Sequence, residues 1–281
     1  MSGASTSGPS NGSLLSVRGL CKEFVSRHRR AEGVVAVDDV SFEIERGTTL
    51  GLVGESGSGK TTTGYCVLRL LHIDRGEVLF EGNDLAQVRG RALRAMRREM
   101  QVVFQDPHSS LNPRMTVAQL LREPLEIHRI GTATSRKFAV AELLELVGLD
   151  AGVAGRFPHE FSGGQRQRIG IARALSLGPK FIVCDEPVSS LDVSVQAQIL
   201  NLLQDIQQER GLTYLFISHD LAVIRAVCDR VAVMKEGRIV EQGSVTEVYE
   251  HPQHAYTREL IKASIPATIR QTEPSIPDSG G

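Results

Sequence analysis

One glycine-rich segment constrains what this 281-residue chain can fold into more than any other feature. The segment reads Gly54-Glu55-Ser56-Gly57-Ser58-Gly59-Lys60-Thr61-Thr62 and fits the phosphate-loop pattern G-x-x-x-x-G-K-[ST]. A short apolar strand over Thr49–Val53 leads into it, and a helical pattern over 60–71 follows. This order of strand, loop and helix is typical of α/β folds that bind nucleotides. A chance glycine-rich turn would not account for the flanking elements.

The residue types in this loop suit a nucleotide phosphate. Glycines allow positive φ and close backbone approach, so successive N–H groups can converge on phosphate oxygens. The loop also feeds a helix N-terminus, whose partial positive charge favours an anion. Lys60 adds a full charge near the β- and γ-phosphates, and the Thr61 hydroxyl is placed to ligate Mg²⁺. We therefore predict binding of a nucleotide with Mg²⁺.

A second segment ends a buried strand in two carboxylates. Four apolar residues at 181–184 precede Asp185 and Glu186, and parallel strands deliver such residues to the ligand-binding edge of a sheet. Asp185 can hold Mg²⁺, and Glu186 can polarise the attacking water as a general base. The alternative is an acidic strand end that only caps a helix. The phosphate loop earlier in the chain favours the catalytic interpretation.

A third segment, Ser162-Gly163-Gly164-Gln165, predicts another helix start suited to an anion, with Ser162 as its N-cap. On physical grounds alone, a capped helix without a ligand is an equally good interpretation. A second phosphate site is hard to explain within one chain that has a single base-carrying strand. It is explained if this segment serves a nucleotide held by a different chain.

Three single residues are further candidates. Gln105 follows a predicted strand at 101–104 and can ligate Mg²⁺ or sense the γ-phosphate, although a polar loop residue is the alternative. His219 ends another strand and can contact the γ-phosphate and orient the water, although a lone His is usually structural. Phe24 can stack on a purine, and a core phenylalanine is an equally good interpretation. We predict Glu186, His219 and Gln105 as the catalytic residues.

The remaining pattern predicts one mixed α/β domain at 14–265 between a disordered tail at 1–13 and a second tail at 266–281. Strand-like spacing covers 14–20 and 40–44, and helices with no intervening strand fill a helical insertion at about 107–178. A helix over Val193–Arg210 separates strands at 181–184 and 214–217, which indicates parallel βαβ packing. A hairpin at 231–241 and two short helices follow.

Composition excludes several classes of protein. With 32 basic and 33 acidic residues, the chain offers no electrostatic case for a nucleic-acid partner. Its four cysteines form no C-x-x-C pair, which favours a reducing compartment over a disulfide framework or zinc site. No apolar run approaches the roughly 20 residues of a membrane-spanning helix, and residues 1–13 lack the apolar core of a signal peptide. We expect a cytosolic chain whose membrane role comes through other subunits.

Over about 14–266, these motifs resemble the ATP-binding subunits of ABC transporters. In that family the three segments are the Walker A motif (54–62), the signature motif (162–165) and Walker B (Asp185 with Glu186). The resemblance also assigns Gln105 to the Q-loop, Asp192 to the D-loop, His219 to the switch histidine and Phe24 to the A-loop aromatic. It implies a P-loop NTPase with a RecA-like core, a helical subdomain and a small antiparallel β subdomain. It further implies a head-to-tail dimer in which each ATP lies between Walker A of one chain and the signature of the other.

A narrower resemblance is to the oligopeptide/dipeptide importer ATPases, specifically the F-type of two paired ATPase subunits. It is carried by Phe104-Gln105-Asp106-Pro107, by the segment around the signature motif and by Cys184-Asp185-Glu186-Pro187. His251-Pro252-Gln253-His254-Ala255-Tyr256-Thr257 resembles the family's His-Pro-Tyr-Thr element, with Ala255 where Pro is usual.

The resemblance implies an ATP hydrolase that lies at the cytoplasmic face of the inner membrane and energises peptide uptake. Its implied partners are two membrane-spanning permease subunits, a second ATPase subunit forming a heterodimer, and an extracytoplasmic substrate-binding protein. Nickel or glutathione importers of the same subfamily are the alternative. A soluble ABC ATPase acting in translation or DNA repair ranks below both, because such proteins carry two cassettes or a long coiled coil.

Overall fold

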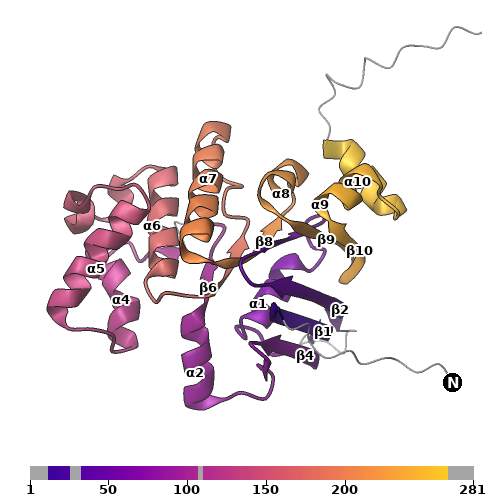
Figure 1. Ribbon diagram of the computed structural model, residues 1–281, viewed down its shortest axis with the longest axis horizontal. Coiled ribbons are helices and arrows are strands. Elements are labelled where there is room, and N and C mark those ends of the chain that lie inside the picture. The colour runs from indigo at the N-terminus through magenta and orange to yellow at the C-terminus, as the bar shows by residue number, and fades with distance from the viewer. Residues whose placement is uncertain (1–11, 26–32, 107–109, 265–281) are drawn as a thin grey trace, which may run out of the picture.

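The computed structural model describes residues 12–25, 33–106 and 110–264 (Figure 1). Residues 1–11 of the expected N-terminal tail and the whole expected C-terminal tail at 266–281 lie outside the described residues. Ser13, expected in the N-terminal tail, already belongs to the first strand. Among the described residues, no helix is both long and apolar enough to cross a membrane.

The larger sheet has six strands in the order β10-β9-β3-β8-β7-β6. Its strands are β3 (Thr49–Val53), β6 (Met100–Val103), β7 (Phe181–Asp185), β8 (Thr213–Ser218), β9 (Arg230–Lys235) and β10 (Arg238–Ser244). All neighbours pair in parallel except β9 and β10, which form an antiparallel hairpin. The predicted βαβ packing and the predicted hairpin are therefore confirmed.

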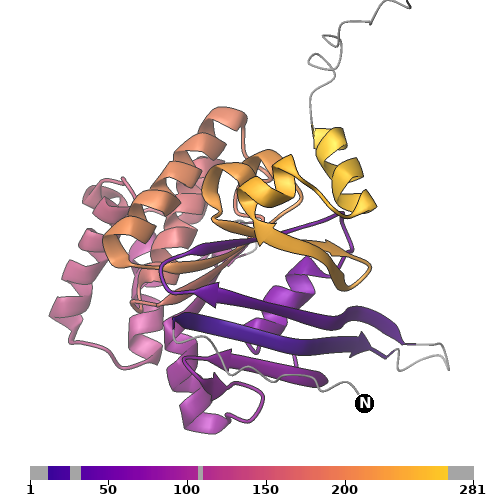
Figure 2. The ribbon, with the colours of Figure 1, turned by 45° about the vertical axis from the view of Figure 1, so that its right-hand side comes forward.

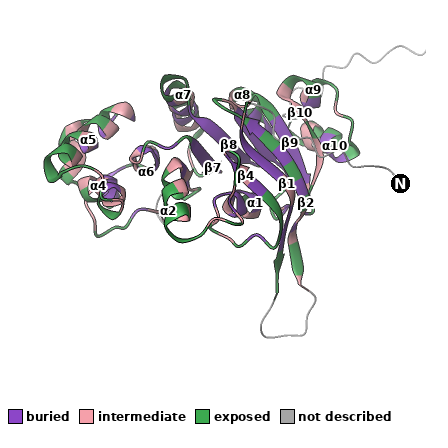
Figure 3. Ribbon diagram, turned by 60° about the horizontal axis from the view of Figure 1, so that its bottom comes forward, coloured by how far each residue is buried: buried purple, intermediate pink, exposed green. Residues whose placement is uncertain are grey.

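The smaller sheet is antiparallel, with the order β2-β1-β4-β5. Its strands are β1 (Ser13–Phe24), β2 (Val34–Glu45), β4 (Arg75–Phe80) and β5 (Asn83–Asp84). β1 and β2 run beyond the predicted spans at 14–20 and 40–44, because their backbone pairing continues out to Phe24 and Val34. That outer part is mostly exposed (Figure 3), so its side chains carry little of the apolar alternation that marks a strand in sequence.

Helices cover the larger sheet and fill the insertion. They are α1 (Lys60–Val67), α2 (Gly90–Glu99), α4 (Val117–Ile127), α5 (Ala133–Leu146), α6 (Gly163–Leu175), α7 (Val193–Arg210), α8 (Leu221–Val227), α9 (Val245–Glu250) and α10 (Ala255–Ser264), with 3-10 turns at Ala151–Gly155 and Pro158–Glu160. Figure 1 shows α4, α5 and α6 gathered at one end of the molecule, away from β1, β2 and β4. The helix predicted over 60–71 is shorter, because the chain turns at Arg69, where φ is 54°.

Central strands are buried on both faces. In β7, Phe181 and Val183 belong to the core between the two sheets, while Ile182 and Cys184 belong to the core on the helical side. Such a strand reads as a continuous apolar run. The view in Figure 2 places the antiparallel sheet beneath the larger sheet. The strand ends that carry the site residues are therefore set on a rigid, two-sided core.

Candidate functional site

The phosphate loop connects β3 to α1 at the carboxyl end of the parallel strands. Three of its glycines have positive φ: 157° at Gly54, 83° at Gly57 and 100° at Gly59. A Cβ at Gly54 would lie 2.1 Å from the Met234 carbonyl oxygen, and one at Gly59 would lie 2.2 Å from that of Ala36. At these two positions, glycine is required by contact as well as by conformation.

The loop opens into a cavity of about 600 Å³. Its lining comprises Ala36, Gly54, Glu55, Ser56, Gly57, Gly59, Lys60, Thr61, Thr62, Gln105, Glu186, His219 and Leu260. The structure therefore brings most of the predicted loop residues together with all three predicted catalytic residues. Ser58 is buried beneath the loop, and its carbonyl accepts a hydrogen bond from the Gly237 N–H at 3.0 Å.

Lys60 is the buried cation of this cavity. Its Nζ donates to the carbonyl oxygens of Gly54 and Glu55, both at 2.8 Å. Burial lowers the pKa of Lys60, against the opposing effect of the nearby Glu186, Asp185 and Glu55 carboxylates. A positive charge that is desolvated in this way interacts strongly with an anion entering the cavity.

Asp185 lies at the end of β7 and is 3% exposed. Its Oδ1 accepts a hydrogen bond from the Thr61 hydroxyl at 2.9 Å. Burial raises the pKa of Asp185, whereas hydrogen bonds from Thr61 and Tyr65 act in the opposite direction. The first turn of α1 and the end of β7 thus place a hydroxyl oxygen and a carboxylate oxygen side by side.

Glu186 is the meeting point of three strand ends. Its Oε2 accepts from Gln105 Nε2 at 3.0 Å, and its Oε1 lies 3.1 Å from His219 Nδ1. Gln105 follows β6 and His219 follows β8, so the two flank the carboxylate from neighbouring strands. The backbone of Glu186 is left-handed, with φ of 46°, which costs a non-glycine residue free energy and is typical of functional sites.

The signature segment lies apart from this cavity. Ser162 caps α6 through a reciprocal pair: Gln165 N–H donates to Ser162 Oγ at 3.3 Å, and Ser162 N–H donates to Gln165 Oε1 at 3.0 Å. Ser162 and Gln165 are exposed, and the segment contributes nothing to the cavity lining. A Cβ on Gly164 would meet Val195 Cγ1 at 2.5 Å, so the segment packs against the start of α7.

Two other predicted residues also lie outside the cavity lining. Asp192 is an exposed residue at the N-terminus of α7. Phe24 ends β1, is 44% exposed and has Lys22 Nζ 5.4 Å from its ring centre. Their nucleotide-binding roles stay predictions. Sequence reasoning missed Ala36 and Leu260 in the lining, because neither carries a polar group or a motif.

Comparisons with known proteins show what this chain is similar to. The family model for the ABC transporter matches residues 37–189. The oligopeptide transport ATP-binding protein OppF of Streptococcus mutans is 53% identical over 235 residues, covering 83% of this chain and 76% of OppF. OppF of Bacillus subtilis is 52% identical over 252 residues, covering 89% and 82%. The solved dimeric ATP-binding cassette MJ0796, in a post-hydrolysis state with ADP and Pi, gives a TM-score of 0.73 at 27% identity, covering 83% of this chain and 99% of that one.

Proposed function

This chain belongs to the ABC transporter family, and we propose that it is the ATP-hydrolysing subunit of an importer for oligopeptides or dipeptides. The observation that carries the catalytic part is the placement of Glu186 between Gln105 and His219, in the same cavity as Lys60. The peptide cargo is supported by relatives named for oligopeptide transport, at 52% and 53% identity.

In this proposal, the phosphate loop and Lys60 bind the ATP phosphates, and Glu186 takes a proton from the attacking water. His219 and Gln105 contact the Glu186 carboxylate from two sides, and these contacts fix its oxygens within the cavity. A fixed carboxylate needs little reorganisation in the transition state, and positioning is the main contribution that proteins make to phosphoryl transfer.

The residues present also fit Mg²⁺. Thr61 Oγ1 and Asp185 Oδ1 lie 2.9 Å apart, and Gln105 borders the same cavity. In the described part of the chain, no group of three His, Cys, Asp or Glu side chains is arranged to hold a metal. Mg²⁺ commonly relies on one or two protein ligands together with phosphates and water. The ion would neutralise phosphate charge, and Thr61, Asp185 and Gln105 would hold it.

We propose that a second ATPase subunit, forming a heterodimer, completes the site. The exposed start of α6 would face that subunit's nucleotide, with the D-loop residue Asp192 beside it. Val193 follows Asp192 and is 81% exposed, so the start of α7 lies at the surface, where Val195 packs against Gly164 of the signature segment.

The permease subunits would contact the groove between the strand core and the helical insertion. A cavity of about 260 Å³ there is lined by Leu70 and Ile127, which are 50% and 58% exposed. An adjoining cavity of about 190 Å³ is lined by Phe104, the residue before Gln105. A permease segment in this groove would contact Phe104, which is bonded directly to Gln105 in the nucleotide cavity. This contact would lie at the cytoplasmic face of the inner membrane.

The test is reconstitution of the chain with its permease subunits, the second ATPase and the extracytoplasmic substrate-binding protein. We expect short peptides to stimulate ATP hydrolysis and to accumulate inside vesicles. Stimulation by nickel or glutathione and not by peptides would select the alternative cargo. Co-purification with ribosomes or DNA, without membrane subunits, would overturn the transport role.

A further inference from the structure

The C-terminal helix α10 contributes to the nucleotide cavity. It lies next to the β9–β10 hairpin near the C-terminal end of the described chain (Figure 1). Leu260, in its second turn, lines the cavity with the phosphate loop. Tyr256, one turn earlier, places its hydroxyl 3.1 Å from the backbone nitrogen of Glu55. The helix therefore contacts the loop by a polar group and borders the cavity by an apolar one.

The contact falls on one particular peptide group. The peptide that joins Gly54 to Glu55 donates its N–H to the Tyr256 hydroxyl and accepts, on its carbonyl, the Lys60 ammonium at 2.8 Å. It is thus held on both sides, by Tyr256 and by the lysine of the phosphate loop. Without the hydroxyl, this peptide would keep the Lys60 contact on its carbonyl and lose the contact on its N–H.

Tyr256 is itself fixed. It is 5% exposed, and Lys235 Nζ lies 4.8 Å from its ring centre. The turn before α10 is anchored by Glu241, whose carboxylate accepts the backbone N–H groups of Gln253 and His254 at 2.7 and 3.0 Å. Such support is what a group needs if it is to hold another group in place.

Simple packing does not explain the hydroxyl. A phenylalanine at 256 would keep the buried ring and its contact with Lys235, and would lose only the hydrogen bond to the loop. Tyr249 offers a built-in comparison, because its hydroxyl also bonds to a backbone group, the Leu221 carbonyl, away from the phosphate loop. Replacing each tyrosine by phenylalanine therefore distinguishes the effect of losing any buried hydroxyl from the effect of losing the one at the phosphate loop.

We propose that Tyr256 is a positioning residue for nucleotide binding: its hydroxyl holds the Gly54–Glu55 peptide, and with it Lys60, in the arrangement that receives the phosphates. The proposal rests on the nucleotide site described above. Binding of ATP by the unchanged chain tests that site, and only the variants below test Tyr256.

The experiment compares Tyr256→Phe with Tyr249→Phe in the full chain. We expect Tyr256→Phe to weaken ATP and ADP binding about threefold to tenfold, the range set by one net hydrogen bond. In the reconstituted transporter, KM for ATP should rise by a similar factor while kcat stays nearly unchanged, because the contact acts equally before and during the reaction. Hydrogen exchange of the backbone around Glu55 should speed up in the nucleotide-free chain, and Tyr249→Phe should change none of these quantities.

Unchanged affinity and unchanged exchange in Tyr256→Phe would overturn the proposal, as would an equal loss of affinity in Tyr249→Phe. If Tyr256→Phe does not yield folded protein, Lys235→Met serves instead, because it removes the ammonium over the ring and leaves the hydroxyl in place. It should weaken nucleotide binding in the same direction and by less. Unchanged affinity in that variant would then count against the proposal.

Discussion

The helices α1 and α6 both begin at glycine-containing segments, and the surroundings of these two segments differ. At α1, the phosphate loop opens into a cavity that also holds Gln105, Glu186 and His219. At α6, Ser162 and Gln165 of the signature segment are exposed, and each side chain hydrogen-bonds to the other's backbone N–H. The start of α1 shares its cavity with these three predicted catalytic residues, and the start of α6 lies outside that cavity.

The difference shows that two glycine-containing helix starts can depend on different surroundings, one on its own chain and the other on groups outside it. The phosphate loop is supported by long-range contacts from its own chain, including Lys60 to its carbonyls and Thr61 to Asp185. The signature segment presents a helix N-terminus to the outside. We therefore propose that this chain binds ATP with the phosphate loop and serves a partner's ATP with the signature segment.

The largest effect is expected where the catalytic neighbours meet. Glu186→Gln should lower ATP hydrolysis by the assembled transporter about 100- to 10,000-fold, the range typical of a lost general base. ATP affinity should remain, because phosphate binding depends on the loop. Steady-state hydrolysis and equilibrium binding measure the two quantities, and normal turnover would remove Glu186 from the catalytic role.

The next effect tests the α1 side of the comparison directly. Lys60→Ala should weaken ATP binding by the isolated chain about 100-fold, because it removes a buried charge-assisted contact to phosphate. Lys137→Ala on the exposed face of α5 is the matched control and should leave affinity unchanged. Equal affinities for the two variants, by titration with a fluorescent nucleotide, would contradict the assignment of Lys60.

Part of this comparison can be predicted from sequence. The residues that follow β6, β7 and β8 converge because neighbouring parallel strands end at the same edge of the sheet. The alternation of strands and helices in the sequence indicates such parallel strands. The helix over Val193–Arg210 was predicted with its observed bounds, because its pattern is long and regular. The seven-residue α8 was missed, since a short apolar run fits a strand or a helix equally well.

Other features could not be predicted because they depend on distant residues. The contact between Tyr256 and Glu55 joins positions 201 residues apart, and nothing local to either one signals it. The positive φ of Glu186 is likewise set by its surroundings, since its N–H is held by the Ile217 carbonyl at 2.9 Å. The sequence therefore indicated most of the polar residues that line the cavity, and the structure adds the contacts that hold them.

A smaller effect is expected from a substitution at the N-cap of α6. Ser162→Ala removes the side-chain acceptor for the Gln165 N–H and should cost about 1 kcal/mol of unfolding free energy. We expect unchanged ATP affinity for the isolated chain and slower hydrolysis in the paired complex. Chemical denaturation and nucleotide titration are the measurements, and a loss of ATP affinity in the isolated chain would show that α6 serves its own chain's nucleotide.

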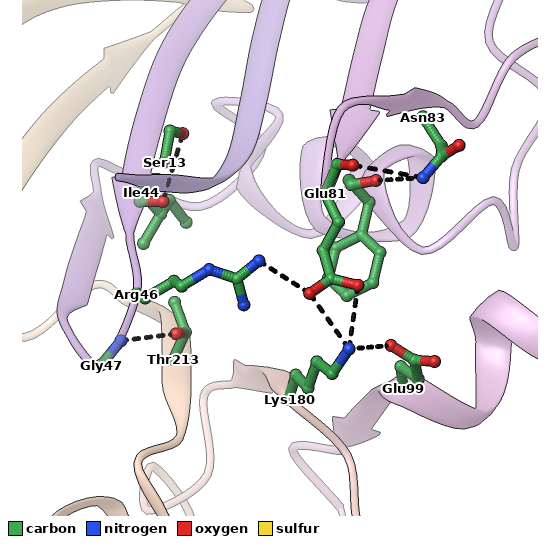
Figure 4. A network of polar contacts seen from close by, with 10 residues as sticks. Ser13, Ile44, Arg46, Gly47, Glu81, Asn83, Glu99, Lys180 and Thr213 are labelled. Carbon is green, nitrogen blue, oxygen red and sulfur yellow. Dashed lines mark hydrogen bonds and ion pairs between the residues drawn. The ribbon is translucent and has the colours of Figure 1, made fainter. Parts of the chain in front are cut away.

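The smallest effect lies outside both helix starts. Lys180 bonds both Glu81 oxygens at 3.0 and 2.9 Å and Glu99 at 2.8 Å, and Arg46 also contacts Glu81 (Figure 4). Lys180→Met should lower the unfolding free energy by about 1 kcal/mol or less, since Lys180 is half exposed and screened by solvent. ATP binding and hydrolysis should not change.

The pH dependence of that small effect follows from the two pKa directions. Hydrogen bonding to Lys180 lowers the pKa of Glu81, so this contribution is present above the usual pKa of Glu and is lost as pH falls through the lowered value. Hydrogen bonding to Glu99 and Glu81 raises the pKa of Lys180, so its contribution is lost only as pH rises through the raised value. The stability difference between the unchanged chain and Lys180→Met should therefore be flat near neutral pH and shrink in acid. A difference that grows in acid would contradict this assignment.

The most direct test of these separate roles for the phosphate loop and the signature segment is Gly163→Asp at the start of α6. A Cβ there meets its nearest neighbour, Leu191 Cδ2, at 3.4 Å, which is ordinary contact, so the variant should fold. The measurement pairs its ATP dissociation constant as an isolated chain with its hydrolysis rate in the reconstituted transporter. We expect the ATP dissociation constant of the isolated chain to be unchanged. We expect the hydrolysis rate of the reconstituted transporter to fall at least to that of a transporter with one working ATP site. An unchanged rate, or a loss of ATP affinity in the isolated chain, would contradict it.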